Sequence, residues 1–249
     1  MKDIALVIST CDRYPATNYF SKTWTNLTIS GVFTSDRLHS VHIASDYRPD
    51  TGRGPWPERM FIDGLPGVAI DHAEEPRYAQ GNCATALLMG ANSGAKWVLQ
   101  IEDDIDVVDD FLGSVGRWLD RHGAEDRPLY AFSSDHSAID RARERGEEFW
   151  EYAVSNFWGF QCFAVSAATA RDLGQWYLDN PGYKHDDGRV DFYSHDIGVQ
   201  RWAAERGHTM FRGSVPVFVQ HLGEERAVPY PSPKRIYFPS WPGREWTFR

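Results

Sequence analysis

The sequence predicts an α/β fold with a mixed, mostly parallel central sheet flanked by helices. Residues 4–10 form a continuous apolar run bounded by polar residues, which is typical of a strand buried on both faces. After Gly81 the apolar residues change to a helical period, and residues 97–101 then form a second continuous apolar run. Strands that alternate with helical segments favour crossover connections and therefore a largely parallel sheet.

The first half of the chain supplies most of these elements. Pro15 is expected to open a helix that runs to about residue 30 and is ended by Gly31. Further strands are expected at residues 38–44 and, more weakly, at 68–70. The next helix places four apolar residues at i, i+3, i+4 and i+7, and Gly94 is placed to end it; these are Ala84, Leu87, Leu88 and Ala91.

Residues 97–101 are expected to be the central strand. Asp110 is placed to cap the following helix, which has four residues on its buried side: Phe111, Val115, Trp118 and Leu119. The second half is less regular, and its expected elements are strands at 129–133, 160–165 and 215–220 and helices at 166–178 and 196–206.

These elements predict one domain over residues 1–228. Residues 229–249 are rich in Pro, Trp, Tyr and Phe, and three roles are open to this tail: a docked segment, a lid or a contact in a homo-oligomer.

The composition narrows the class of protein. The chain has 249 residues, 42% of them hydrophobic, and a net charge of -9, which disfavours a duplex DNA binder that relies on phosphate contacts. No signal peptide precedes the first strand, and no stretch reaches the ~20 apolar residues that span a bilayer. We therefore expect a cytoplasmic protein without a membrane span.

An acidic cluster follows the central strand and consists of Glu102, Asp103, Asp104 and Asp106. Ligands of open α/β sheets bind at the carboxyl ends of strands. Clustered carboxylates repel one another unless a cation offsets their charge, and hard oxygen ligands suit Mg²⁺ or Mn²⁺. The alternative is a solvated acidic loop at the start of the next helix. The spacing does not fit an EF-hand, because the central glycine and the terminal glutamate are missing.

Residues 97–107 resemble the DxD-type motif of GT-A glycosyltransferases, in the nucleotide-diphospho-sugar transferase superfamily. The motif is similar to the Glu-Asp-Asp type of N-acetylglucosaminyltransferases. The resemblance implies that Asp104 holds Mn²⁺ or Mg²⁺ against the donor diphosphate and that Asp103 contacts the ribose or orients the site. Asp106 is the alternative metal ligand if the motif is taken as Asp104-x-Asp106.

The same resemblance implies that residues 1–228 are a catalytic domain, with residues 1–110 as its nucleotide-binding half and residues 111–228 as its acceptor half. It also implies a nucleotide pocket at the ends of the first two strands. Thr10 and Arg13 lie where such enzymes begin this pocket, and Asp46 matches a carboxylate that often contacts the base. Arg77 opens a segment similar to the basic one that precedes the metal motif. For Asp46 and Arg77, an ordinary surface charge is the competing interpretation.

Three later segments complete the expected site. Trp158 and Gly159 resemble the segment beneath the acceptor and the donor sugar, where aromatic rings suit sugar C–H faces and glycine allows close approach. His195 and Asp196 resemble the acidic dipeptide that supplies the base of inverting members, so Asp196 is the candidate base and His195 an acceptor contact. A simple N-cap is the competing role for Asp196. His221 follows a late strand and is a candidate metal ligand.

The implied activity is transfer of a sugar from a nucleotide-diphosphate donor, with UDP as the expected nucleotide, to an acceptor hydroxyl, with inversion. The acceptor stays open among a glycan, a protein and a modified nucleic-acid base. One alternative is a binding module that keeps the fold without turnover. Another is a non-haem iron, 2-oxoglutarate oxygenase that uses His185, Asp187 and His221, which would require an all-β scaffold.

Overall fold

The computed structural model describes residues 2–11, 19–46, 57–124, 127–133, 138–184, 190–192 and 194–222. Its first half contains β1 (Ile4–Cys11), α1 (Tyr19–Ile29), η1 (Val32–Thr34), β2 (Leu38–Asp46), α2 (Pro57–Asp63), β3 (Val68–His72), α3 (Tyr78–Ala91), β4 (Trp97–Glu102), β5 (Ile105–Val107) and α4 (Phe111–His122). Its second half contains β6 (Tyr130–Ala131), α5 (Ala138–Glu144), β7 (Phe149–Ala153), η3 (Val154–Asn156), β8 (Cys162–Ser166), α6 (Ala167–Asp179), β9 (Gly182–Lys184), β10 (Val190–Phe192), α7 (His195–Glu205), β11 (Met210–Ser214) and β12 (Val219–His221).

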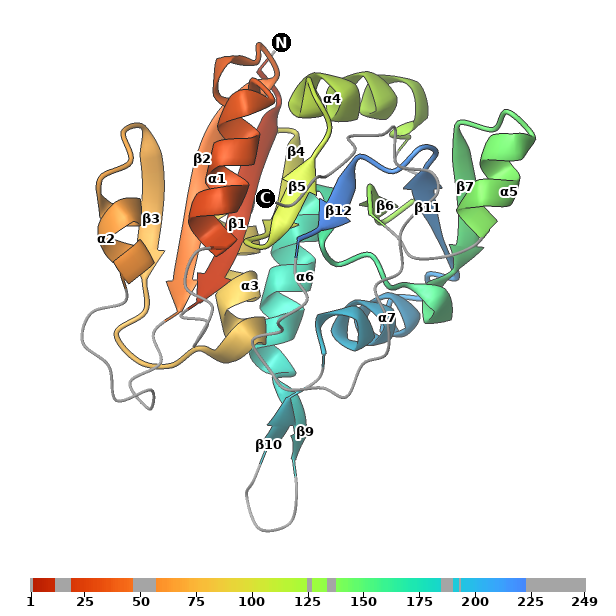
Figure 1. Ribbon diagram of the computed structural model, residues 1–249. Helices are drawn as coiled ribbons and strands as arrows, with labels where there is room; N and C mark the ends of the chain where they lie inside the picture. The colour runs from red at the N-terminus through yellow and green to blue at the C-terminus, as the bar shows by residue number, and fades with distance from the viewer. Residues whose placement is uncertain are drawn as a thin grey trace.

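An eight-stranded sheet in the order β3-β2-β1-β4-β8-β6-β11-β7 forms the centre of the molecule (Figure 1). β3, β2, β1 and β4 are mutually parallel, whereas β4 pairs with β8 in antiparallel register. The expected α/β class, with a mixed, mostly parallel sheet flanked by helices, is confirmed. The chain leaves β1 toward β2 and β3 and returns to the other side of β1 as β4. The point where the strand order reverses therefore lies between β1 and β4, which is where open α/β sheets bind ligands.

Alternate residues of the central strands point to opposite faces of the sheet and belong to two separate hydrophobic cores. In β4, Leu99 and Ile101 belong to the core formed with α1, α2 and α4, and Val98 belongs to the core formed with α3, α5, α6 and α7. Helices cover both faces of the sheet (Figure 1), so both sets of side chains are removed from water. Burial on both faces explains why residues 4–10 and 97–101 are continuous apolar runs in the sequence.

Most expected elements are confirmed to within a few residues, including the helix ends at Gly31 and Gly94, both of which have positive φ. The strand expected at residues 215–220 was wrong, because β11 ends at Ser214 and β12 starts at Val219. Pro216 lies in the gap and has no N–H to donate to a sheet. The expected cap at Asp110 was also wrong: it occupies the N-cap position without a side-chain cap hydrogen bond, and its carboxylate pairs with Arg117 instead.

Residues 229–249 lie outside the described part of the chain, as does the first part of the helix expected from Pro15. The division into nucleotide-binding and acceptor halves stays a prediction. Within the described ranges, no helix is long and apolar enough to cross a membrane.

Candidate active site

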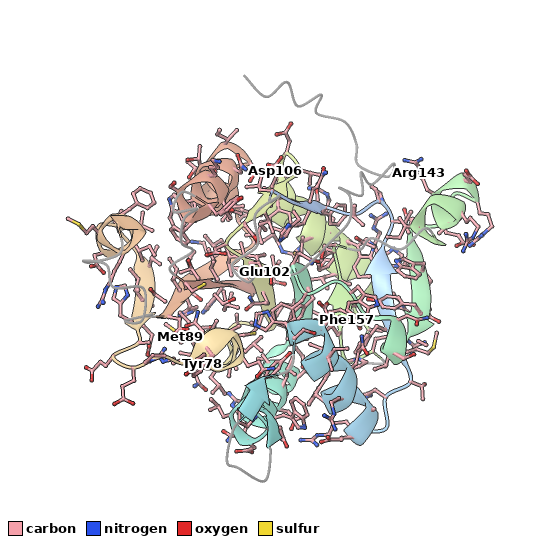
Figure 2. All side chains as sticks on the ribbon, turned by 60° about the horizontal axis from the view of Figure 1, so that its bottom comes forward. Tyr78, Met89, Glu102, Asp106, Arg143 and Phe157 are labelled. Atoms are coloured by element: carbon pink, nitrogen blue, oxygen red, sulfur yellow. The ribbon has the colours of Figure 1, made fainter. Side chains whose placement is uncertain are left out.

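The carboxyl ends of β1, β2 and β4 bring polar residues to one edge of the sheet. Thr10 lies at the end of β1, Asp46 ends β2 and Glu102 ends β4. β1 is hydrogen-bonded to both other strands, so these three ends are neighbours. Figure 2 shows Glu102 near the middle of the molecule. The candidate site therefore surrounds the reversal point between β1 and β4.

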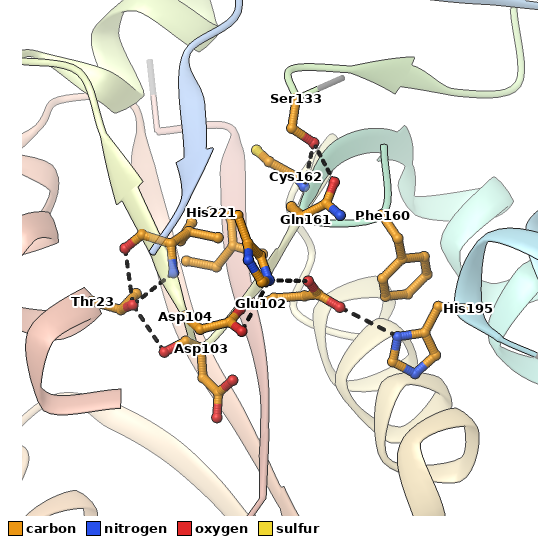
Figure 3. A network of polar contacts seen from close by, with 12 residues as sticks. Thr23, Glu102, Asp103, Asp104, Ser133, Phe160, Gln161, Cys162, His195 and His221 are labelled. Carbon is orange, nitrogen blue, oxygen red and sulfur yellow. Dashed lines mark hydrogen bonds and ion pairs between the residues drawn. The ribbon is translucent and has the colours of Figure 1, made fainter. Parts of the chain in front are cut away.

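Three ligand-type side chains converge there. One potential ligand atom from each of Glu102, Asp104 and His221 lies within 4.8 Å of the other two (Figure 3). The Nε2 atom of His221 is 3.0 Å from Oδ2 of Asp104 and 3.9 Å from Oε2 of Glu102. Two carboxylates and one imidazole form a donor set that suits Mn²⁺ or Mg²⁺, because both cations prefer oxygen and Mn²⁺ also accepts imidazole. The residues present thus fit the expected cation.

Backbone pairing brings His221 to the acidic segment. β12 pairs with β5 in antiparallel register, with His221 opposite Ile105, and the N–H of Leu222 donates to the carbonyl oxygen of Asp104 at 2.7 Å. Thr23 of α1 holds the bend between β4 and β5, which is formed by Asp103 and Asp104. Its hydroxyl lies 2.9 Å from the carbonyl oxygen of Asp103 and accepts a hydrogen bond from the N–H of Ile105 at 3.0 Å. The position of Asp104 is therefore set by three elements that are distant in sequence.

Asp106 lies outside this three-residue group. It is buried in β5 opposite Gln220, and its Oδ1 accepts the N–H of Val107 at 2.9 Å. Figure 2 shows Asp106 well away from Glu102. The structure thus brings together two of the three expected metal ligands, Asp104 and His221, and adds Glu102 to them.

Asp103 points into the protein beside β1. Its Oδ2 accepts a hydrogen bond from the Thr10 hydroxyl at 2.6 Å, and both side chains are almost completely buried. This contact joins the ends of β1 and β4 across the reversal point. A buried carboxylate that accepts a short hydrogen bond holds the end of the strand in a fixed position.

The end of β2 is tied to the start of α3. Oδ1 of Asp46 accepts the backbone N–H of Arg77 at 2.8 Å, and the Arg77 guanidinium pairs with Asp71 of β3. Asn82 donates to the carbonyl oxygens of Thr10 and Ala44, which fixes α3 against β1 and β2. Asp46 and Arg77 therefore lie together at the expected nucleotide edge, whereas Arg13 lies outside the described residues.

The first turn of α7 faces Glu102 from the other side. Nδ1 of His195 is 3.5 Å from Oε1 of Glu102, and its ring packs 4.2 Å from the ring of Phe160, measured between centroids (Figure 3). Ser194, and not Asp196, caps the helix by accepting the N–H of Ile197. The competing N-cap role of Asp196 is thereby excluded.

Asp196 instead anchors the loop before β8. Its Oδ1 accepts the N–H of Phe160 at 3.2 Å. Burial raises the pKa of the Tyr152 phenol, and the nearby negative charge of Asp196 raises it further. Burial, followed by the charges of Cys83 and Asp196, likewise raises the pKa of Tyr177. Asp196 therefore lies in the first turn of α7, close enough to both phenols for its charge to raise their pKa values.

The aromatic segment before β8 divides into an exposed and a buried part. Trp158 is 48% exposed, whereas Phe157 and Phe160 are buried. A Cβ atom on Gly159 would lie 2.7 Å from the carbonyl oxygen of Ser133. The glycine is thus required by the close approach of the Ser133 backbone, a constraint that the sequence pattern did not reveal.

Four contributing residues escaped the expected set of site residues: Glu102, Thr23, Ser133 and Gln161. Glu102 carried a signal, since it belongs to the acidic cluster at the end of the central strand. No sequence pattern points to Thr23, Ser133 or Gln161, because only the packing of α1 and the register of β8 bring these residues to the site.

The scaffold argues against the iron oxygenase. That chemistry was expected to need an all-β double sheet, and the chain instead forms an α/β sheet with helices on both faces. His185 and Asp187 lie outside the described residues.

The fold and the site together define an α/β protein in which two carboxylates and one imidazole converge at the carboxyl edge of the sheet. No protein-family model matches the chain, and no curated protein matches it. A solved structure of S. aureus TarS 1-349 is similar in fold, with 12% sequence identity and a TM-score of 0.48 over 86% of this chain and 61% of that chain. This chain therefore spans less than two thirds of the TarS chain.

Mannose-1-phosphate geranyltransferase from Thermus thermophilus is also similar. It shares 14% identity and a TM-score of 0.49 over 88% of this chain and 76% of that chain. Identity and TM-score are low in both comparisons, so neither carries an argument about activity.

Proposed function

We propose that this protein is a metal-dependent glycosyltransferase that moves a sugar from a nucleotide-diphosphate donor, with UDP as the nucleotide, to an acceptor hydroxyl. The observation that carries the proposal is the convergence of Glu102, Asp104 and His221 at the reversal point of the sheet. A cation held there would face the edge where α/β proteins bind nucleotides. The acceptor is a hydroxyl compound, with a glycan, a protein and a modified nucleic-acid base as the three classes to test.

The proposed cation is Mn²⁺ or Mg²⁺, held by Asp104 and His221 as expected and by Glu102 in addition. When bound, such a cation supplies Lewis-acid stabilisation of the charge on the diphosphate leaving group. The protein contributes a fixed donor set: the Asp104 backbone is held by Leu222, and the bend is held by Thr23. Asp106 supports β5 in this arrangement and is the secondary ligand candidate.

The donor nucleotide is assigned to the edge formed by β1, β2 and the start of α3. Asp46 would contact the base and Arg77 the nucleotide, while Asp103 and Thr10 would orient the ribose side of the site. The support is their common position at the strand ends, with Asp46 bonded to the Arg77 backbone and Thr10 bonded to Asp103. Arg13 keeps its expected role at the start of this pocket.

Asp196 is the proposed general base. As the acceptor oxygen attacks the anomeric carbon, its proton passes to the Asp196 carboxylate. The bond from the anomeric carbon to the phosphate oxygen breaks, and the nucleoside diphosphate leaves with the electron pair. This single displacement inverts the anomeric configuration. His195, Trp158 and Gly159 lie near this end of the site and are the proposed contacts to the acceptor or sugar.

The experiment is a thermal-shift screen of nucleotide sugars with and without Mn²⁺. A donor at about one hundred times its Kd should raise the Tm by roughly 5–10 °C in the presence of the cation. Asp104→Asn and His221→Gln should remove this shift, while Asp109→Asn, an exposed carboxylate of the same segment, should retain it. Absence of any Mn²⁺-dependent shift in the wild-type protein would reject the proposal. A shift without donor hydrolysis or transfer would favour the binding module.

A further inference from the structure

Gln161 lies directly across the sheet from Glu102. The antiparallel register of β4 and β8 pairs Ile101 with Cys162, so Glu102 and Gln161 are the next opposite residues, and the Glu102 N–H donates to the Gln161 carbonyl oxygen at 3.1 Å. Opposite residues of an antiparallel pair project to the same face with Cβ atoms roughly 5 Å apart. The Gln161 side chain is therefore a neighbour of the metal-ligand candidate Glu102 (Figure 3).

Ser133 fixes one end of the Gln161 amide. Oε1 of Gln161 accepts a hydrogen bond from the Ser133 hydroxyl at 3.2 Å. Ser133 is itself buried, and its hydroxyl accepts the N–H of Cys162 at 3.1 Å and lies 3.0 Å from the carbonyl oxygen of Gly159. The opposite end of the amide, Nε2, points away from Ser133 (Figure 3) and has no hydrogen-bond partner among the described residues.

His195 is a second residue beside Glu102. His195 faces Oε1 of Glu102 through Nδ1, and its Nε2 is buried without a hydrogen-bond partner among the described residues. Phe160, the residue before Gln161, packs on the His195 ring. Buried polar atoms in folded proteins are normally satisfied, so an unsatisfied one at a site indicates a ligand or water atom.

Gln161 and His195 lie beside Glu102 but are not members of the group formed by Glu102, Asp104 and His221. Glu102 directs Oε2 toward His221 and Asp104 and Oε1 toward His195. An amide nitrogen donates hydrogen bonds and has no lone pair for a cation. The free end of Gln161 is therefore suited to an oxygen atom of the substrate and not to the metal.

We propose that Gln161 determines donor specificity by donating a hydrogen bond from Nε2 to a hydroxyl oxygen of the transferred sugar. The inference rests on the proposed function, since it places the diphosphate at the Asp104 and His221 side of Glu102 and the sugar at the Gln161 and His195 side. Ser133 is a positioning residue, because it acts only through the amide that it holds.

The test compares UDP with UDP-glucose, UDP-galactose and UDP-N-acetylglucosamine by calorimetry in Mn²⁺. The quantity measured is the ratio of the Kd for UDP to the Kd for the donor that the wild-type protein binds best. Gln161→Leu should lower this ratio about three- to tenfold, the value of one neutral hydrogen bond, without changing the affinity for Mn²⁺ or UDP. Gln161→Glu keeps an acceptor for Ser133 but has no N–H, so it should lower the ratio to a similar degree.

Controls separate the possible outcomes. Gln175→Leu makes the same change on α6, where the side chain bonds Asp179, and should leave the ratio unchanged. Melting temperatures confirm that each variant is folded. An unchanged ratio in both Gln161 variants overturns the inference, and so does an equal loss of affinity for UDP or Mn²⁺, which would make Gln161 a phosphate or metal contact. If the wild-type protein binds neither UDP nor any UDP-sugar, the proposed function fails as well.

Discussion

The imidazole of His221 lies 3.0 Å from the carboxylate of Asp104, and this pair joins the end of β12 to the bend after β4. The two residues lie far apart in sequence, and the β5–β12 ladder determines their meeting. Asp104 is almost completely buried. A buried carboxylate with an imidazole beside it and a second carboxylate nearby is a favourable set of ligands for a divalent cation.

Asp196→Asn tests the assigned base. The substitution retains the shape of the side chain and an oxygen that accepts the Phe160 N–H, but it removes the group that takes up a proton. Donor turnover, measured as hydrolysis or as transfer to an acceptor, should fall by about 10²–10⁴, while the Kd of the donor stays constant. Transfer at a near-normal rate would remove Asp196 from this role.

Thr23→Val tests the support of the acidic bend. The buried hydroxyl accepts the N–H of Ile105 and contacts the Asp103 carbonyl, so valine leaves that N–H without a partner. Unfolding free energy should fall by about 1–3 kcal/mol, and Mn²⁺ affinity should fall about 10- to 100-fold, as for other groups that orient metal ligands. Urea unfolding and Mn²⁺ titration measure the two effects.

Thr25→Val provides the matched control for Thr23, because its exposed hydroxyl donates to the Ser21 carbonyl of the same helix. Equal metal affinities for wild-type protein and Thr23→Val would show that the bend does not depend on α1.

Gly159→Ala tests the close approach of two backbone segments. The added Cβ would lie 2.7 Å from the Ser133 carbonyl oxygen, so one segment must shift, at a cost of about 1–3 kcal/mol. Gly64→Ala is the control, since its Cβ would make only an ordinary contact at 3.5 Å. A Gly159→Ala protein as stable as the control in denaturant melts would contradict the packing described.

Glu151 gives a pH-dependent contribution to stability. Hydrogen bonds from Arg212 and then Arg127 lower its pKa below the ordinary value of 4.5. A lowered pKa in the folded state means that the stabilisation is present above pH 4.5 and is lost as the pH falls through the folded-state pKa. Glu151→Gln should therefore lower the Tm by about 1–3 °C near neutral pH, and the difference from wild type should shrink in acid.

The control for this prediction is Glu147→Gln, which removes an exposed pair with Arg145 two residues away and should leave the Tm nearly constant. A Tm difference for Glu151→Gln that persists unchanged well below pH 4.5 would show that the lowered pKa is not its cause.

Periodicity made the central elements predictable. β1 and β4 are buried on both faces, and the buried faces of α3 and α4 extend over three turns, so each leaves a long apolar pattern. The seven-residue helices α2 and α5 are too short to show one. The late strand was misplaced because Pro216 divides an apolar run that looks uniform in the sequence.

The proximity of Asp104 and His221 was predictable, because each is a metal-ligand type of residue at or just after the end of a strand. The choice between Glu102 and Asp106 was not predictable, because the bend after Glu102 interrupts the alternation of side chains. Gln161 depends on the register of β8 against β4, and no local pattern specifies that register. The places of Glu102, Asp106 and Gln161 in the site therefore depend on tertiary strand pairing, which residue type alone does not determine.

The most direct measurement is the anomalous difference map of a crystal of this protein soaked with Mn²⁺ and UDP. We expect a manganese peak bonded to Glu102, Asp104 and His221, with diphosphate oxygens completing its coordination. A map with no peak among these side chains, at saturating Mn²⁺ and with UDP visible elsewhere, would contradict it.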